Sequence, residues 1–337
     1  MRALIPLVMV AALATATGAA PTPEGVRGDI VWITWAPGST ILFNANEGPY
    51  SVRPDGSGLR RVGPRGSHPV WAPDGSRIAV DVGDFPGSIV VMNADGSGAH
   101  RVRTGGMYPV WSPSGNRIAV TTTRRILVMN ADGSAVRKVA ALHWGQDFMR
   151  ELDWSPDESR VVFSQCLRYV PEGDLCSGDR REGTFTASAD RTLGRKRRVV
   201  TVAGCPDWAP GPRIAVAGGH AVRVVEPDGS RPRVAVPRPI ACGAWSPDGR
   251  LVAAETDGAL ILAKADASAR WRVCKLPPPP FNLASELAPA PAWSPDGKWI
   301  AVARTLGNPE RGTSSRIYVI RVRDGRARVI VRTPFSG

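Results

Sequence analysis

Short apolar runs, each preceded by a tight-turn signal, recur along the whole chain. The clearest is Trp299-Ile300-Ala301-Val302, which follows Trp293-Ser294-Pro295-Asp296-Gly297. Proline presets φ, aspartate bonds its own backbone two residues on, and glycine accepts a positive φ, so the second segment predicts a turn. The apolar run is too short for a helix and predicts a buried strand. The pattern therefore predicts a repeated strand–turn–strand unit in which a tryptophan ends the first strand.

Seven tryptophans occupy this place and are called the anchors below. They are spaced 36 to 54 residues apart: Trp35, Trp71, Trp111, Trp154, Trp208, Trp245 and Trp293. A second turn signal, such as Asp95-Gly96, follows in most copies and precedes a basic, β-branched segment. Each copy thus supplies four antiparallel strands, as a propeller blade does. We predict an all-β fold, a seven-bladed β-propeller of four-stranded antiparallel blades, with six blades as the alternative.

Antiparallel order assigns the connections of each blade to two faces. The turns between strands one and two, and between three and four, share one face, which we call the turn face. The remaining connections share the opposite face, the irregular-loop face. Its long connections are expected at residues 141–151, 165–183, 275–289 and 305–314. Variable loops on a rigid scaffold are where binding usually occurs, so we expect any binding site on the irregular-loop face.

Aromatic, basic and acidic residues in or beside these loops are the candidates for partner binding. They are Trp144, Phe148, Arg150, Asp153, Tyr169, Arg180, Arg181 and Phe281. The alternative is that the aromatic residues only hold their own loops in place. Asp153 and Asp207 each directly precede an anchor tryptophan. They are expected either to bind a cation or polar ligand, or to cap neighbouring backbone.

The basic charge of the chain does not by itself indicate a binding partner. The formal net charge is +13, and only five of the 43 basic residues are lysine. The basic residues are expected to cluster in the last strand of each repeat, at Arg60, Arg61, Arg101, Arg103, Arg137, Lys138, residues 195–198, Arg231, Arg233, Arg270, Arg272, Arg326 and Arg328. Charge on the outer edge of a blade prevents pairing with other sheets. We favour this role over binding of an acidic partner, and expect no nucleic acid.

The N-terminal segment predicts export. Met1-Arg2 is basic, residues 4–13 are apolar and small residues follow, as in a signal peptide over residues 1–19. A retained single anchor is the alternative. We place a short linker at 20–28, the propeller at 29–333 and a tail at 334–337. The expected location is periplasmic or extracellular, with no other membrane span.

Five cysteines fit an oxidising compartment. Cys166 and Cys176 share one long loop and are one candidate disulfide. Cys205 and Cys242 each lie three residues before an anchor tryptophan and are another, although strands of different blades can be too far apart for a disulfide. Cys274 is left over. The histidines are scattered, so we expect no metal site.

Together, the Trp-Ser-Pro-Asp-Gly motif and segments such as Val128-Met129-Asn130-Ala131-Asp132-Gly133-Ser134 resemble the TolB-type, WD-like β-propeller repeats of exported bacterial proteins. The resemblance covers residues 29–333. TolB itself is similar to a six-bladed propeller preceded by an α/β domain, whereas here about ten residues separate the signal segment from the first strand. The resemblance implies a propeller scaffold and no particular activity.

No hydrolase or metalloprotease motif occurs, so no catalytic residue and no cofactor is assigned. We expect a monomeric, non-enzymatic scaffold that binds a protein, peptide or cell-envelope polymer through its irregular-loop face. The alternative is a propeller hydrolase or lyase acting on a carbohydrate or lactone at the central channel.

Overall fold

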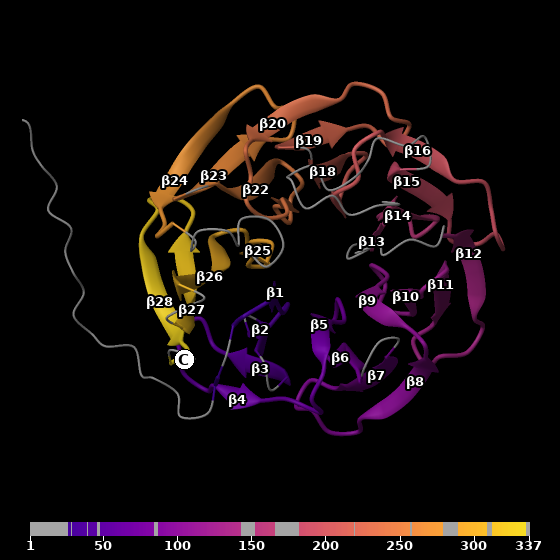
Figure 1. The fold of residues 1–337 in the computed structure, drawn as a ribbon, viewed down its shortest axis with the longest axis horizontal. Helices are drawn as coiled ribbons and strands as arrows, with labels where there is room; N and C mark the ends of the chain where they lie inside the picture. The colour runs from indigo at the N-terminus through magenta and orange to yellow at the C-terminus, as the bar shows by residue number, and fades with distance from the viewer. Residues whose placement is uncertain are drawn as a thin grey trace, which may run out of the picture.

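The computed structural model describes most of the predicted propeller. The described residues are 26–27, 29–38, 40–45, 48–83, 87–142, 152–165, 182–218, 220–256, 258–278, 289–308 and 312–334. Within these ranges every regular element is a strand, and no helix is long and apolar enough to cross a membrane. The 28 strands form seven four-stranded antiparallel sheets arranged in a ring (Figure 1). The seven-bladed propeller is therefore confirmed, and the six-bladed alternative is wrong.

Each blade takes its four strands consecutively from the chain. Blade 1 contains β1 (Trp32–Trp35), β2 (Ile41–Ala45), β3 (Gly48–Val52) and β4 (Arg60–Arg61). Blade 2 contains β5 (Ser67–Trp71), β6 (Arg77–Val82), β7 (Ser88–Asn93) and β8 (His100–Thr104). Blade 3 contains β9 (Met107–Trp111), β10 (Arg117–Thr121), β11 (Arg125–Asn130) and β12 (Arg137–Ala141). Blade 4 contains β13 (Leu152–Trp154), β14 (Arg160–Gln165), β15 (Gly183–Ser188) and β16 (Arg197–Val200).

The last three blades follow the same order. Blade 5 contains β17 (Cys205–Trp208), β18 (Ile214–Gly218), β19 (Ala221–Val225) and β20 (Arg233–Pro237). Blade 6 contains β21 (Ala244–Trp245), β22 (Leu251–Thr256), β23 (Ala259–Lys264) and β24 (Arg270–Lys275). Blade 7 contains β25 (Ala292–Trp293), β26 (Trp299–Asn308), β27 (Gly312–Arg321) and β28 (Ala327–Arg332). In every blade the first strand is innermost and ends on an anchor tryptophan (Figure 1).

The hydrophobic core lies between the blades. Its buried residues form seven clusters in the described part of the chain, and each cluster joins two neighbouring blades. One of them joins Ile33 and Trp35 of blade 1 to Ala301 and Val319 of blade 7. No strand is shared between these two blades. Side-chain packing between the first and last blades therefore contributes to the closure of the ring, which needs no shared strand.

The anchor tryptophans also bond one blade to the next. The indole Nε1 of Trp154 donates a 3.1 Å hydrogen bond to the carbonyl of Val110, which precedes the anchor of blade 3. Equivalent bonds run from Trp111, Trp245 and Trp293 to the preceding blades. The anchor thus supplies both apolar area and a directional bond across the junction.

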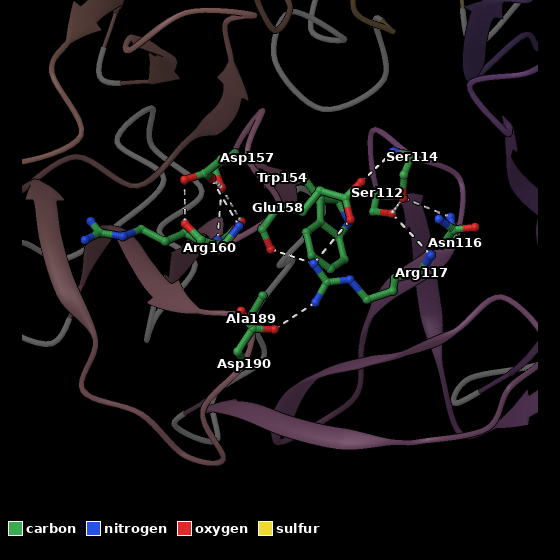
Figure 2. A network of polar contacts seen from close by, with 12 residues as sticks. Ser112, Ser114, Asn116, Arg117, Trp154, Asp157, Glu158, Arg160, Ala189 and Asp190 are labelled. Atoms are coloured by element: carbon green, nitrogen blue, oxygen red, sulfur yellow. Dashed lines mark hydrogen bonds and ion pairs between the residues drawn. The ribbon is translucent and has the colours of Figure 1, made fainter.

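The residue that opens the second strand reinforces the same junctions, as Figure 2 shows for Arg117. Its guanidinium lies 4.8 Å from the centre of the Trp154 ring. It donates to the carbonyl of Glu158 at 2.7 Å and to Asp190 Oδ1 at 2.9 Å. Arg77 lies over Trp111 and donates to the carbonyl of Gly115 in the same way. The basic residue after the turn therefore holds the turn of the next blade.

Two expectations are corrected by the structure. Residues 305–314 are mostly not an irregular loop: β26 and β27 continue through them, pairing Thr305 with Ser315 and Asn308 with Gly312. Gly307 and Asn308 are residue types common in loops, but the two strands pair through them, and the hydroxyl groups of Thr305 and Ser315 also bond across the strands at 3.0 Å. In addition, four of the basic residues expected in the last strands lie before those strands instead: Arg195, Lys196, Arg231 and Arg326.

Candidate binding site at the inner rim

The inner strands bring equivalent residues of different blades together around the axis (Figure 1). Each of these strands starts toward the irregular-loop face and ends on its anchor. We call the position three residues before the anchor the rim position. Its described occupants, in blade order from blade 1 but without blade 4, are Trp32, His68, Tyr108, Cys205, Cys242 and Ala290. The rim therefore has an aromatic side, in blades 1 to 3, and a cysteine side, in blades 5 and 6.

On the aromatic side, three rings contact one another edge to face. The ring centres of Trp32 and His68 lie 5.3 Å apart at an interplanar angle of 78°. Those of His68 and Tyr108 lie 4.3 Å apart at 63°. Edge-to-face contact is a favoured arrangement of aromatic pairs. All three residues remain partly exposed.

Asp81, near the end of β6, fixes this arrangement. Its Oδ2 lies 2.9 Å from His68 Nδ1 and accepts a 3.2 Å bond from the backbone N–H of Tyr108. Its Oδ1 accepts a 3.1 Å bond from the backbone N–H of Ser67. One carboxylate thus binds two inner strands. We call Trp32, His68, Asp81 and Tyr108 the inner-rim cluster.

The backbone at the cluster is unusual. His68 and Tyr108 have φ values of 48° and 51°, in the left-handed region that such residues rarely adopt. The β5–β6 and β9–β10 registers both shift at these points. Such bulges redirect side chains, and they are common next to functional sites. The bonds to Asp81 offset the strain and hold the rings in place.

The chemistry of the cluster follows from these contacts. A carboxylate oxygen only accepts hydrogen bonds, so His68 Nδ1 carries the proton that lies between the two side chains. When the imidazole is neutral and Nδ1 carries its proton, Nε2 is an acceptor or base. The side chains of His68 and Asp81 are 24% and 11% exposed, so the histidine is the more accessible of the two. The cluster combines apolar ring surface with one oriented polar group.

Asp153 and Asp207 form a second polar feature of the inner strands. Asp153 accepts backbone N–H bonds from Trp154 at 2.8 Å and from Trp208 at 2.7 Å. Asp207 accepts the backbone N–H of Trp245 at 2.7 Å and also bonds to Asp153. Burial raises the pKa of Asp153 to about 6, although these hydrogen bonds favour its ionised form. The two aspartates therefore cap backbone of neighbouring blades, which is one of the two expected roles.

The other expected partner-binding residues cannot be placed. Trp144, Phe148, Arg150, Tyr169, Arg180, Arg181 and Phe281 lie outside the described residues, as do Cys166 and Cys176. On the cysteine side of the rim, Cys205 and Cys242 form a disulfide with a Cα–Cα distance of 5.4 Å. The adjacent inner strands are thus close enough for this pairing. Cys274 forms no disulfide with a described cysteine, and burial raises the pKa of its thiol to about 11, which makes it a poor nucleophile at neutral pH.

Sequence reasoning missed the aromatic side of the rim. The signal was present, because Trp32, His68 and Tyr108 precede their anchors by the same three residues as Cys205 and Cys242. Among the residues that can be placed, no group of three or more His, Cys, Asp and Glu side chains is arranged to hold a metal ion.

Comparison with known proteins gives the fold and no closer identity. No protein-family model matches this chain, and no curated protein does. Among solved structures, an oligogalacturonate lyase from Vibrio parahaemolyticus is similar, with a TM-score of 0.59 and 13% identity over 91% of this chain and 87% of the lyase. A puromycin-hydrolyzing peptidase from Mycobacterium tuberculosis gives a TM-score of 0.64 and 14% identity, over 91% of this chain and 54% of the peptidase. The β-propeller domain of Cps50 from Myceliophteria thermophila gives a TM-score of 0.55 and 11% identity, over 90% of this chain and 96% of that domain. At these identities the likeness establishes the propeller alone.

Proposed function

We propose that this chain is an exported, non-enzymatic binding scaffold that engages a protein, peptide or cell-envelope polymer through its irregular-loop face. The observation that supports this function best is the inner-rim cluster. Three partly exposed aromatic rings meet at the irregular-loop end of the inner strands, and Asp81 bonds to the His68 side chain and to the backbone of Ser67 and Tyr108. Aromatic groups held rigid before binding lose little conformational entropy when a ligand arrives.

Export is part of the proposal. The N-terminal signal pattern motivates it, and the Cys205–Cys242 disulfide is consistent with it, because structural disulfides persist in oxidising compartments. The disulfide joins rim positions of two adjacent blades and so keeps the cysteine side of the rim rigid. The rim thus has exposed aromatic rings for binding on one side and a disulfide that links two blades on the other.

The test compares a rim variant with a matched variant of the turn face. The rim variant is Trp32→Ala with Tyr108→Ala. The control is Leu193→Ala, which removes a side chain that is 50% exposed between β15 and β16. Each folded protein is cross-linked in cell-envelope extract, and the captured partner is purified and titrated. The wild type and the control should bind it equally, and the rim variant at least about tenfold more weakly. Equal affinities for all three proteins would overturn the proposal.

One contact favours a second candidate, a hydrolase or lyase acting on a carbohydrate or lactone. The 2.9 Å contact between His68 Nδ1 and Asp81 is the arrangement of a general base oriented by a carboxylate. The test is turnover of a glycan and lactone panel by the wild type and by His68→Gln. Turnover that the substitution abolishes, while ligand binding persists, would replace the scaffold with an enzyme.

A further inference from the structure

The outermost strands of all seven blades carry charge of a single sign. Their 33 residues include fourteen arginines and lysines and not one aspartate or glutamate. The whole chain, by contrast, has 43 basic and 30 acidic residues. We call the Arg and Lys side chains of β4, β8, β12, β16, β20, β24 and β28 the basic belt. Figure 1 shows that these strands follow one another around the circumference of the ring.

Part of the belt has a structural role. Arg60 donates to the carbonyl of Asp95 at 2.9 Å, and Arg197 donates to the carbonyl of Asp228 at 3.2 Å. Arg328 donates to the carbonyl of Pro54 across the closure between blades 7 and 1. Each of these arginines therefore holds a turn of the next blade.

Other belt residues make no such bond. Arg101, Arg233, Arg270 and Arg272 are exposed, and none of their side chains forms a hydrogen bond or ion pair with any residue that the structure describes. Beside Arg101, the Nε of Arg103 is buried without a partner in the same part of the chain. These two arginines line a shallow hollow on β8. Guanidinium groups thus remain available for an external acceptor.

Protection of the sheet edges does not explain this pattern. Either sign of charge blocks edge pairing, and a mixture of signs would do so with less self-repulsion. Twelve of the fourteen belt residues are arginine. Arginine dominates the basic residues of the whole chain as well, and its planar fork of donors matches carboxylate and phosphate groups, so the belt is suited to an anionic ligand.

We propose that the basic belt binds a flexible linear polyanion, whose phosphate or carboxylate groups pair with its arginines. The shape of the belt selects this ligand. A flat anionic membrane touches a curved circumference at only a few blades, and duplex DNA is stiff over about 150 base pairs. A flexible chain can follow one outer strand after another. This site is separate from the inner rim and does not depend on the function proposed there.

The experiment measures binding of long-chain polyphosphate and of polygalacturonate as a function of salt. Release of counterions should make the logarithm of the association constant fall linearly with the logarithm of salt concentration. The belt variant carries Arg101→Gln, Arg233→Gln and Arg272→Gln. It should bind about tenfold or more weakly at low salt, and the magnitude of its salt slope should fall by about one per lost contact.

The control removes three charges from the turn face: Arg250→Gln, Lys298→Gln and Arg326→Gln. These side chains are 84%, 74% and 82% exposed. The control has the same net charge as the belt variant and should bind like the wild type. The polymer that binds more tightly identifies the anionic group. Equal weakening in both variants, or tighter binding to anionic vesicles or duplex DNA than to either polymer, would overturn the proposal.

Discussion

The guanidinium of Arg304 lies 3.0 Å from the carboxylate of Glu255, and both side chains are sealed from solvent, at 1% and 0% exposed. Glu255 lies on β22 of blade 6, and Arg304 lies on β26 of blade 7. The two carboxylate oxygens, and Nε and Nη1 of Arg304, have no hydrogen-bond partner in the described part of the chain. A buried charge pair with so few hydrogen bonds regains little of its lost hydration.

Burial should therefore make the stability of the propeller depend on pH. Burial raises the pKa of Glu255 from 4.5 to about 7, although Arg304 favours the ionised form. Between these values the folded protein holds a proton that the unfolded chain has released. The contribution of Glu255 to stability is thus most favourable below about pH 4.5 and is lost as pH rises to about 7. Relative to Glu255→Gln, the wild type should lose on the order of 3 kcal/mol of unfolding free energy over this range.

Urea unfolding of both proteins from pH 4.5 to 7.5 measures this difference. Glu226→Gln is the control, because Glu226 is partly exposed and its contact with Arg213 is long, at 4.0 Å. The unfolding free energy of the Glu226→Gln control should follow the same pH dependence as that of the wild type. A Glu255→Gln curve that also stays parallel would show that Glu255 does not change its protonation in this range.

Removing one partner of the Glu255–Arg304 pair should lower the free energy of unfolding more than removing both partners. Arg304→Met leaves a buried carboxyl without its cation, and we expect a loss of about 3–5 kcal/mol at neutral pH. The double substitution Glu255→Met with Arg304→Met leaves apolar groups of similar size and should recover most of that loss. Urea titrations of the wild type, Glu255→Met, Arg304→Met and the double variant give the coupling energy. A double variant less stable than Arg304→Met would show that the pair stabilises the junction.

The seven-bladed architecture could be predicted from the sequence because a short motif marks each blade. The anchor tryptophan, the proline-containing turn that begins two residues later and the apolar run are close in sequence and repeat seven times, so counting them gives the blades. The turn face and the irregular-loop face follow from antiparallel order alone. The error at residues 305–314 arose because Gly307 and Asn308 resemble a loop, whereas long-range pairing extends β26 and β27 through them.

The candidate site was harder to predict, because its contacts join residues that are distant in sequence. Asp81 contacts Tyr108 of the next blade, and Glu255 contacts Arg304 from 49 positions away. No local pattern brings such pairs together. Comparing equivalent positions across blades would have revealed the rim, since Trp32, His68 and Tyr108 share one offset from their anchors.

The indole bonds between blades should make a measurable contribution to the free energy of unfolding. Trp154→Phe removes the donor to the carbonyl of Val110, whose lost bond should contribute about 1–2 kcal/mol beyond the lost ring area. Trp35 is the matched control. It is 8% exposed against 3% for Trp154, and its Nε1 is buried without a partner among the residues that can be placed. Trp35→Phe should therefore destabilise less. Equal losses in chemical denaturation would assign the whole effect to packing.

The disulfide of the rim should stabilise the propeller through the unfolded state. Cys205 and Cys242 are 37 residues apart, and closing a loop of that length restricts the unfolded chain by about 4 kcal/mol in the chain-entropy estimate. We expect Cys205→Ser with Cys242→Ser to unfold at lower urea concentration by a corresponding amount, measured without reductant. Cys274→Ser is the control, because it removes a thiol that forms no disulfide with a described cysteine. If the double variant were as stable as Cys274→Ser, the native rim would gain nothing from the covalent link, and packing alone would hold blades 5 and 6 together.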